Sequence, residues 1–191
     1  MKIGVLALQG AVIEHIHMLR SLGAEAVEVR LPEDLKSLKG LIIPGGESTT
    51  IGKLAVKFNL MDPLRKLALS KPVWGTCAGM IFLAKDTGMG QPVLGIMDIA
   101  VKRNAFGRQI DSFETDVYVN VLEHGRSKPF PAIFIRAPKL VKTGSKVKVL
   151  AKLEDRTVVA ALEGKMLVTS FHPELSDDNR FHQFFLNLAR D

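Results

Sequence analysis

Short apolar runs alternate with amphipathic stretches through the first half of the chain. The apolar runs end at glycine, proline or charged residues and predict strands over residues 3–8, 26–30, 40–43 and 72–75. The stretches between them carry apolar residues at helical spacing and predict helices over residues 11–22, 48–69 (broken around Asp62-Pro63) and 80–85. Strands that alternate with helices indicate a parallel sheet covered on both faces, so we expect an α/β fold.

The second half is rich in strand patterns separated by glycine, proline or charged turns. Strands are expected over residues 94–103, 113–121, 132–135, 146–153, 157–162 and 166–170, and a last helix over about residues 178–190. Some of these strands should form antiparallel hairpins. Since the chain shows no repeat or linker, we expect this half to pack on the same sheet, giving one domain over residues 1–191.

Composition argues against a nucleic-acid-binding, a disulfide-bonded or a membrane protein. The 26 Lys and Arg give a net charge of +6, but they are interleaved with 20 acidic residues rather than gathered in a block, so we do not expect nucleic-acid binding. Cys77 is the single cysteine, which excludes an intrachain disulfide and favours the cytoplasm. No apolar run reaches the roughly 18 residues of a membrane span, and we expect neither membrane binding nor a signal peptide.

The clearest chemical motif is Gly75-Thr76-Cys77-Ala78-Gly79, between a predicted strand and a predicted helix. A G-x-nucleophile-x-G sequence in that context forms a tight turn that pushes the nucleophile into a cleft, and the helix N-terminus favours a thiolate. The alternative interpretation of Cys77 is a buried structural cysteine. The two glycines and the strand-turn-helix context favour the nucleophile.

His172-Pro173-Glu174 supplies a base and a carboxylate just after the predicted strand 166–170. Proline favours an extended His172, so side chains 172 and 174 should point to one side and the carboxylate should reach one ring nitrogen. A thiolate, an imidazole and an orienting acid make a nucleophilic triad. The other histidines (His15, His17, His124 and His182) are interpreted as surface or packing residues.

Pro44-Gly45-Gly46-Glu47-Ser48 connects a predicted strand to a predicted helix. Amides of Gly45 or Gly46, together with that of Ala78, could form an oxyanion hole, although an ordinary tight turn with Ser48 capping the helix is equally compatible with this sequence.

Two arginines lie among apolar residues, Arg103 and Arg136, and either could clamp a substrate carboxylate or end a strand in solvent. The chain has no phosphate-binding glycine motif and no Cys-rich metal site, and we expect no cofactor and no metal.

Several blocks together resemble a known family. The elbow and the His-Pro-Glu segment resemble the class I (triad) glutamine amidotransferases. More narrowly, the glutaminase subunit of the ribose-phosphate-dependent pyridoxal phosphate synthase is similar in blocks that span most of the chain: residues 4–12, 44–50, 103–109, 112–114 and 134–138.

This resemblance implies a flavodoxin-like fold with Cys77 as nucleophile, His172 as base and Glu174 as its orienter. It also implies that glutamine binds at Gly46, Glu47, Ser48, Arg103, Ile135 and Arg136. The implied partner is a separate (β/α)-barrel synthase subunit that receives the ammonia for pyridoxal phosphate (vitamin B6) synthesis. By the same analogy, the Gly45-Gly46 loop should be misaligned until that partner binds.

Two alternatives from other classes remain open at this stage. A Cys-His-Glu hydrolase or peptidase would act alone on γ-glutamyl or peptide bonds, and a non-catalytic module would use Cys77 for binding or redox sensing.

Overall fold

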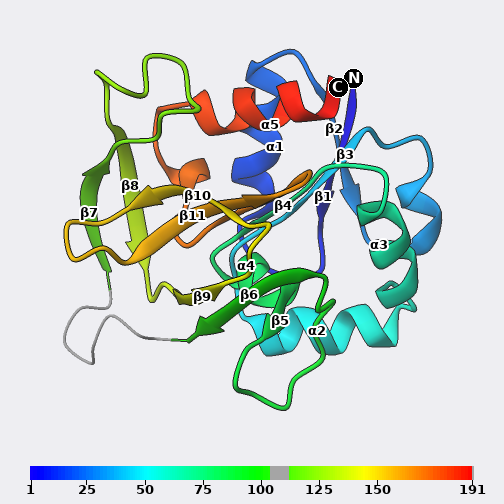
Figure 1. Ribbon diagram of the computed structural model, residues 1–191. Helices are drawn as coiled ribbons and strands as arrows, with labels where there is room; N and C mark the ends of the chain where they lie inside the picture. Colours follow the sequence, from blue (N-terminus) through cyan, green and yellow to red (C-terminus); the bar gives the residue numbers. More distant parts are fainter. Residues whose placement is uncertain (104–111, 191) are drawn as a thin grey trace.

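The computed structural model describes residues 1–103 and 112–190, which form a curled sheet flanked by helices (Figure 1). The larger sheet has the strand order β2-β1-β3-β4-β12-β11-β9-β6-β5, with β10 paired to β11. From β2 to β12 the neighbouring strands are parallel, whereas β12-β11, β11-β9 and β9-β6 are antiparallel. The predicted class is thus confirmed: a flavodoxin-like, mostly parallel centre with added antiparallel strands.

The parallel part consists of five short apolar strands near the predicted positions. They are β1 (Lys2–Leu6), β2 (Glu25–Val29), β3 (Gly40–Ile43), β4 (Val73–Thr76) and β12 (Met166–Thr169). β4 and β12 pair in parallel with Thr76 opposite Thr169, so the segments that follow them leave the sheet at the same edge. This pairing brings Cys77 and His172 to one place.

The helices are α1 (Val12–Ser21), α2 (Ser48–Lys57), α3 (Met61–Ala68), α4 (Ala78–Leu83) and α5 (Arg180–Arg190), with 3₁₀ turns η1 (Pro32–Leu35) and η2 (Pro173–Leu175). The break predicted in the helical stretch 48–69 is present, but it lies at residues 58–60, a few residues before Asp62-Pro63. α2 ends earlier, where Asn59 takes φ 56°, and Pro63 is tolerated in the first turn of α3. The predicted helix 80–85 stops at Leu83 because the next residues pair with β6.

The remaining strands are β5 (Ala84–Asp86), β6 (Met97–Lys102), β7 (Ser112–Val117), β8 (Phe130–Ile135), β9 (Lys139–Thr143), β10 (Lys148–Lys152) and β11 (Val158–Glu163). β9 was not predicted, because its lysines interrupt the apolar pattern of a strand and only one of its residues, Leu140, is buried. Within the described residues, β7 and β8 pair with each other and not with the larger sheet, but Val117, Phe130 and Phe134 share one hydrophobic core with residues of that sheet.

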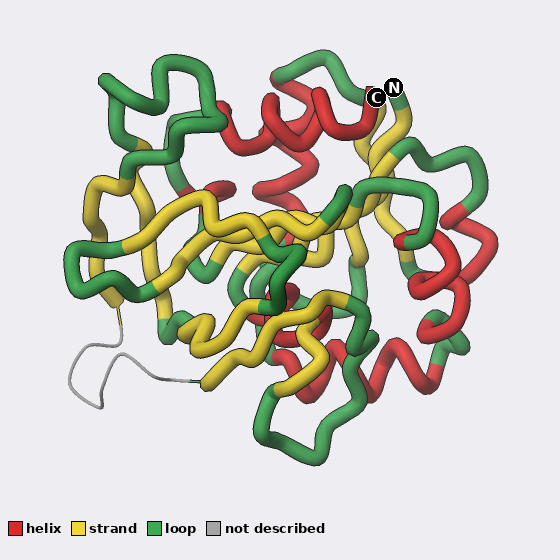
Figure 2. The backbone as a smooth tube through the Cα atoms, in the orientation of Figure 1, coloured by secondary structure: helices red, strands yellow, loops and turns green. Residues whose placement is uncertain are grey.

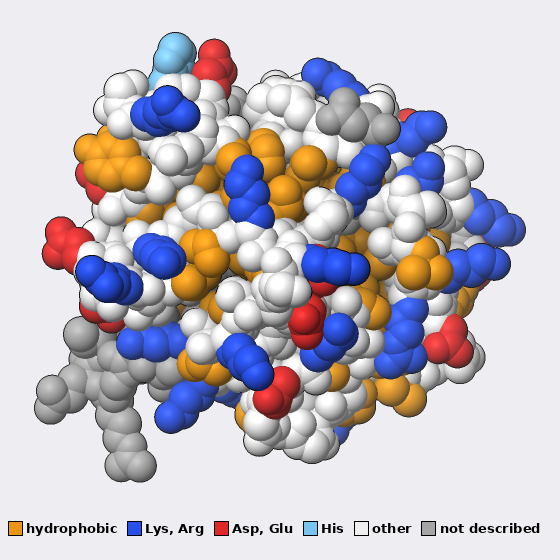
Figure 3. All heavy atoms as spheres, viewed as in Figure 1, with side chains coloured by type: hydrophobic (Ala, Val, Ile, Leu, Met, Phe, Trp, Pro, Cys, Tyr) orange, Lys and Arg blue, Asp and Glu red, His pale blue; other side chains and the backbone are white. Residues whose placement is uncertain are grey.

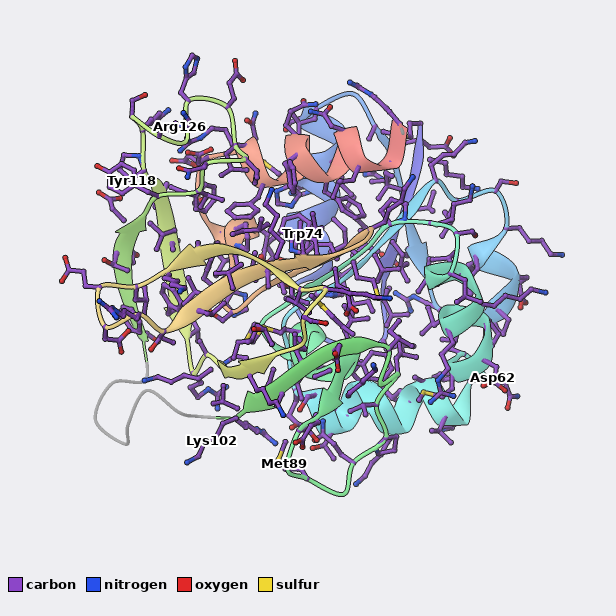
Figure 4. The ribbon with its side chains drawn as sticks, in the orientation of Figure 1. Asp62, Trp74, Met89, Lys102, Tyr118 and Arg126 are labelled. Carbon is purple, nitrogen blue, oxygen red and sulfur yellow. The ribbon has the colours of Figure 1, made fainter. Side chains whose placement is uncertain are left out.

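Two apolar cores cover the two faces of the sheet. α1 and α5 pack on one face, and α2, α3 and α4 on the other (Figures 1 and 2). Trp74 of β4 lies fully buried between the sheet and α5 (Figure 4). Its ring is stacked on Phe181 of α5, with centroids 6.0 Å apart.

The surface is mixed in charge. On the face shown in Figure 3, Lys and Arg side chains are spread among polar and apolar residues rather than gathered in a block. Within residues 1–103 and 112–190, none of the helices combines the length and the hydropathy needed to cross a membrane.

Candidate active site

Cys77 lies in a strained turn between β4 and α4. Its backbone has φ 48° and ψ −104°, a conformation that an L-residue adopts only when its surroundings impose it. The flanking glycines explain how the turn fits: a Cβ on Gly75 would overlap the backbone of Gly79, and a Cβ on Gly79 would overlap the carbonyl of Ile43. The expected geometry of a nucleophile elbow is present.

His172 lies beyond the end of β12, and its backbone N–H donates to the carbonyl of Ile133 at 2.8 Å. Its Nδ1 lies 2.7 Å from Oε1 of Glu174. The expected extended 172–174 segment was wrong, since Pro173–Leu175 forms a 3₁₀ turn. The turn nevertheless brings the carboxylate to Nδ1 and leaves Nε2 unused by Glu174. The Sγ of Cys77, which lines the same cavity as the ring, lies 3.8 Å from the carbonyl oxygen of Ile135.

Charge at the site is arranged to keep His172 protonated. Burial by itself would lower the pKa of His172, but the hydrogen bonds and negative charges of Cys77 and Glu174 raise it to about 10. Burial would likewise raise the pKa of Glu174, whereas His15 and His172 hold it below its ordinary value. The site therefore favours a protonated His172 beside the ionised carboxylate of Glu174.

The Gly45-Gly46 loop packs directly against these residues. A Cβ on Gly45 would overlap the His172 ring and come within 3.3 Å of Cβ of Cys77. The carbonyl of Gly45 accepts from the N–H of Ala11 at 3.1 Å, so the Gly46 N–H of the same planar peptide points away from Ala11.

Residues Gln9 and Gly10 fix this loop from the other side. The side-chain Oε1 of Gln9 accepts from the N–H of Glu47 at 2.5 Å. Gly10 has φ 107°, and a Cβ there would overlap the Gly45 carbonyl. Neither residue was among the predicted site residues, although both fall in the resembling block 4–12.

Glu47, and not Ser48, caps α2: its carboxylate accepts from the N–H of Thr50 at 2.7 Å. It also forms an ion pair with Arg103, whose Nη2 lies 2.8 Å from Oε1 of Glu47. Burial opposes ionisation, but the hydrogen bonds from Thr50 and the charge of Arg103 lower the pKa of Glu47 to about 2. The rim thus carries one anion and one cation side by side.

A cavity of about 340 Å³ collects nearly all the predicted site residues. Cys77, Ala78 and His172 lie at its base, while Glu174 is buried behind His172 and does not line it. The other predicted residues that line the cavity are Gly45, Gly46, Glu47, Ser48, Arg103, Ile135 and Arg136. Residues 104–109 of the resembling block 103–109 lie outside the described residues. Over the described ranges, no group of three or more His, Cys, Asp or Glu is arranged to hold a metal ion.

His15, interpreted from the sequence as a surface or packing residue, lies against Glu174, with its Nε2 3.4 Å from Oε2 of the carboxylate. The interpretation as a packing residue was right in part, because the side chains of His15 and His182 are both fully buried. A possible signal was the position of His15 beside the buried residue Ile16 in α1, but no sequence pattern links α1 to Glu174.

Comparison with known proteins gives the family. Residues 5–190 match the SNO glutamine amidotransferase family. Two relatives named pyridoxal 5'-phosphate synthase subunit PdxT are similar along their whole length. The one from Dehalococcoides mccartyi is 62% identical over 100% of this chain and 98% of its own, and the one from Herpetosiphon aurantiacus is 57% identical over 98% of this chain and 100% of its own. A crystal structure of a glutamine amidotransferase superposes with a TM-score of 0.93 at 49% identity, covering 99% of both chains. The chain belongs to the SNO glutamine amidotransferase family.

Proposed function

We propose that this chain hydrolyses glutamine to glutamate and ammonia with the triad Cys77, His172 and Glu174, and delivers the ammonia for pyridoxal phosphate synthesis. The observation that carries the proposal is the meeting of Cys77 and His172 in one cavity, with Glu174 bound to Nδ1 of the ring so that Nε2 is left for the reaction. Family membership supports glutamine as the substrate.

The first chemical step is acylation. The Cys77 thiolate attacks the side-chain amide carbon of glutamine, and the carbonyl electron pair moves onto oxygen. The Gly46 and Ala78 amides, or that of Gly45, stabilise this oxyanion. The tetrahedral intermediate collapses as His172 gives its Nε2 proton to the leaving nitrogen, which departs as ammonia and leaves a γ-glutamyl thioester.

The second step is hydrolysis of the thioester. His172, now neutral, removes a proton from water as the water attacks the thioester carbonyl. The second tetrahedral intermediate releases glutamate and the Cys77 thiolate, and His172 is again protonated. Glu174 stays ionised through both steps and stabilises the imidazolium.

The charged rim fits the ends of an amino acid. Arg103 and Arg136 provide guanidinium groups for the substrate carboxylate, and Glu47 provides a carboxylate for its ammonium group. Gly46, Ser48 and Ile135 complete the glutamine site. Arg136 has φ 43°, a strained conformation consistent with a side chain held for binding.

The partner is a pyridoxal phosphate synthase subunit, which by resemblance is a (β/α)-barrel. The names of the relatives support a shared complex, since each is called a subunit of that synthase. We assign one glutaminase domain to residues 1–191 and place the reaction in the cytoplasm, where a single catalytic thiol stays reduced.

Labelling with a glutamine-like electrophile tests the assignment of the site. An inhibitor that carries a diazoketone in place of the side-chain amide should modify Cys77, and excess glutamine should prevent this. Because Cys77 is the single cysteine, intact-mass analysis followed by peptide mapping identifies the position without ambiguity. Labelling that glutamine does not slow would contradict a glutamine site at this cavity.

A further inference from the structure

Behind the triad lies a buried pair of histidines that the proposed chemistry does not use. His15 of α1 and His182 of α5 are both fully buried, and Nδ1 of His15 lies 2.9 Å from Nε2 of His182. Both rings make T-shaped contacts with Trp74, with ring centroids 5.7 Å and 4.9 Å from that of the indole. Two titratable rings are thus joined to each other in an apolar enclosure.

This pair reaches the free side of the triad carboxylate. Glu174 uses Oε1 for His172, while its Oε2 lies 3.4 Å from Nε2 of His15. Among the described residues Oε2 has no partner that meets hydrogen-bond geometry, so the approach of His15 is its nearest polar contact with a nitrogen donor, and Glu174 is 6% exposed. His15 Nε2 also lies 3.3 Å from Oγ1 of Thr76, the residue that precedes the nucleophile. Contacts from α1 therefore support two segments of the site.

Burial favours the neutral form of both histidines. It lowers the pKa of His15, although the charges of Glu174 and Glu14 oppose this and that of His172 adds to it. Burial also holds the pKa of His182 well below its ordinary value, and His15 adds to that effect. A neutral ring carries one N–H, on either Nδ1 or Nε2, and the contacts of the ring decide between these two tautomers.

The contacts select one of the two tautomer arrangements. If His15 carried its proton on Nδ1, its Nε2 lone pair would face the Glu174 carboxylate, and His182 would have to carry its proton on Nδ1. That atom is buried and has no hydrogen-bond partner in the described part of the chain. If both rings carry their protons on Nε2, His182 donates to Nδ1 of His15, and His15 donates towards Oε2 of Glu174. The atom left without a partner is then Nδ1 of His182 as an acceptor. The second arrangement is favoured because it leaves no buried N–H donor unpaired.

We propose that His15 is a positioning residue for the glutaminase triad: held by His182, it directs its Nε2–H to Glu174 Oε2 and fixes the carboxylate that orients His172. This inference rests on the proposed function. Because His15 does not line the cavity, it acts on the triad through Glu174 and not on the substrate. Its loss should reduce kcat and leave the KM for glutamine unchanged.

A pair of amide substitutions separates this role from packing. In His15→Gln the terminal amide reaches about as far as the original Nε2 and can still donate to Glu174. In His15→Asn the amide reaches only as far as Nδ1, so the contact with His182 is kept and that with Glu174 is lost. His17→Asn, on the exposed side of the same helix, is the matched control.

The assay measures glutamate release with the synthase subunit present. We expect His15→Asn to lower kcat about tenfold or more, because the triad is misplaced. The kcat of His15→Gln and of His17→Asn should stay within about twofold of wild type. The KM for glutamine should be unchanged in all three variants. Equal losses in His15→Asn and His15→Gln would show a packing role, and wild-type kcat in His15→Asn would show no role. Either result overturns the proposal.

The tautomers can be tested on the wild-type protein, without relying on the folding of a variant. Nitrogen-15 NMR of histidine-labelled protein distinguishes protonated from unprotonated ring nitrogens. We expect the proton on Nε2 in both His15 and His182, and a proton on Nδ1 of His15 would overturn the proposal. If the wild-type complex failed to hydrolyse glutamine, the proposed function would fail, while this spectrum would still decide the arrangement at Glu174.

Discussion

Gly45 and His172 lie so close together that the glycine cannot carry a side chain. The position of an added Cβ overlaps Cε1 of the ring and lies 3.0 Å from Nδ1, the atom bound to Glu174. The Gly-Gly loop therefore packs against the base of the triad as well as offering amides to an oxyanion. The position of the loop and the position of the His172 ring therefore depend on each other.

Gly45→Ala should displace the His172 ring and reduce kcat by about a hundredfold, the loss typical of reacting groups moved by an ångström. Gly90→Ala is the matched control, because no atom lies within 4 Å of an added Cβ and Gly90 does not have positive φ. Steady-state glutamate release with the synthase subunit present measures both. A Gly45→Ala variant with wild-type kcat would show that the loop can move away without consequence.

Arg103→Ala should weaken glutamine binding and leave the fold intact. Its ion pair with Glu47 is more than one-third exposed on both sides, and such pairs contribute little to the free energy of unfolding. We expect KM to rise about tenfold, as for loss of a charged hydrogen bond to the substrate, with an unchanged Tm. Arg30→Ala, which removes another exposed ion pair (with Glu28), is the control and should alter neither quantity. An unchanged KM in Arg103→Ala would exclude this residue from the substrate site.

Protonation of His172 should depend on Cys77. The structure raises the pKa of His172 to about 10 partly through the thiol, so Cys77→Ala should lower it. NMR titration of the ring C–H signals measures this, and His17, exposed on α1, is the internal control. If the His172 ring of the wild-type protein lost its proton near pH 6.5, the inferred pairing of a protonated His172 with Cys77 and Glu174 would be contradicted.

The same shift predicts how stability changes with pH. The pKa of His172 in the folded chain, about 10, exceeds the ordinary value of 6.5, so the folded chain binds this proton more tightly than the unfolded chain does. The stabilisation from His172 should be complete below pH 6.5 and decline as the pH rises towards 10. Urea unfolding at a series of pH values, with His172→Gln as reference, measures the difference. A difference that grows with pH over this interval would contradict the assignment.

Arg180 should matter for stability more than for catalysis. Its guanidinium binds both carboxylate oxygens of Asp178 and the carbonyls of Glu123, Lys128 and Pro129, which ties the 118–129 loop to α5. Arg180→Ala removes the donor of these part-buried hydrogen bonds and should lower the free energy of unfolding by about 2 kcal/mol. Arg190→Ala, at the exposed end of the same helix, should cost less than about 0.5 kcal/mol. Equal urea midpoints for the two variants would contradict this prediction.

The sequence allowed the principal site residues to be predicted where the signal is local. The glycines around Cys77 and the spacing of His172 and Glu174 are short-range features, and β4 and β12 could be expected to end at the same edge of a parallel sheet. The conformation after His172 was not predictable in the same way, because the 3₁₀ turn depends on packing around Glu174. The contact of His15 with Glu174 depends on how α1 docks on the sheet, and no local pattern encodes that. Likewise, β9 is a strand because it pairs with β6 and β11, despite its lysines.

Ammonia and glutamate release from glutamine is the most direct measurement of the central claim. The purified chain should be assayed alone and with a pyridoxal phosphate synthase subunit added, and Cys77→Ala should be assayed beside it. We predict turnover that appears or rises sharply with the partner and is absent in Cys77→Ala. Equal turnover with and without the partner would instead indicate a hydrolase that acts alone, and turnover retained by Cys77→Ala would contradict the triad.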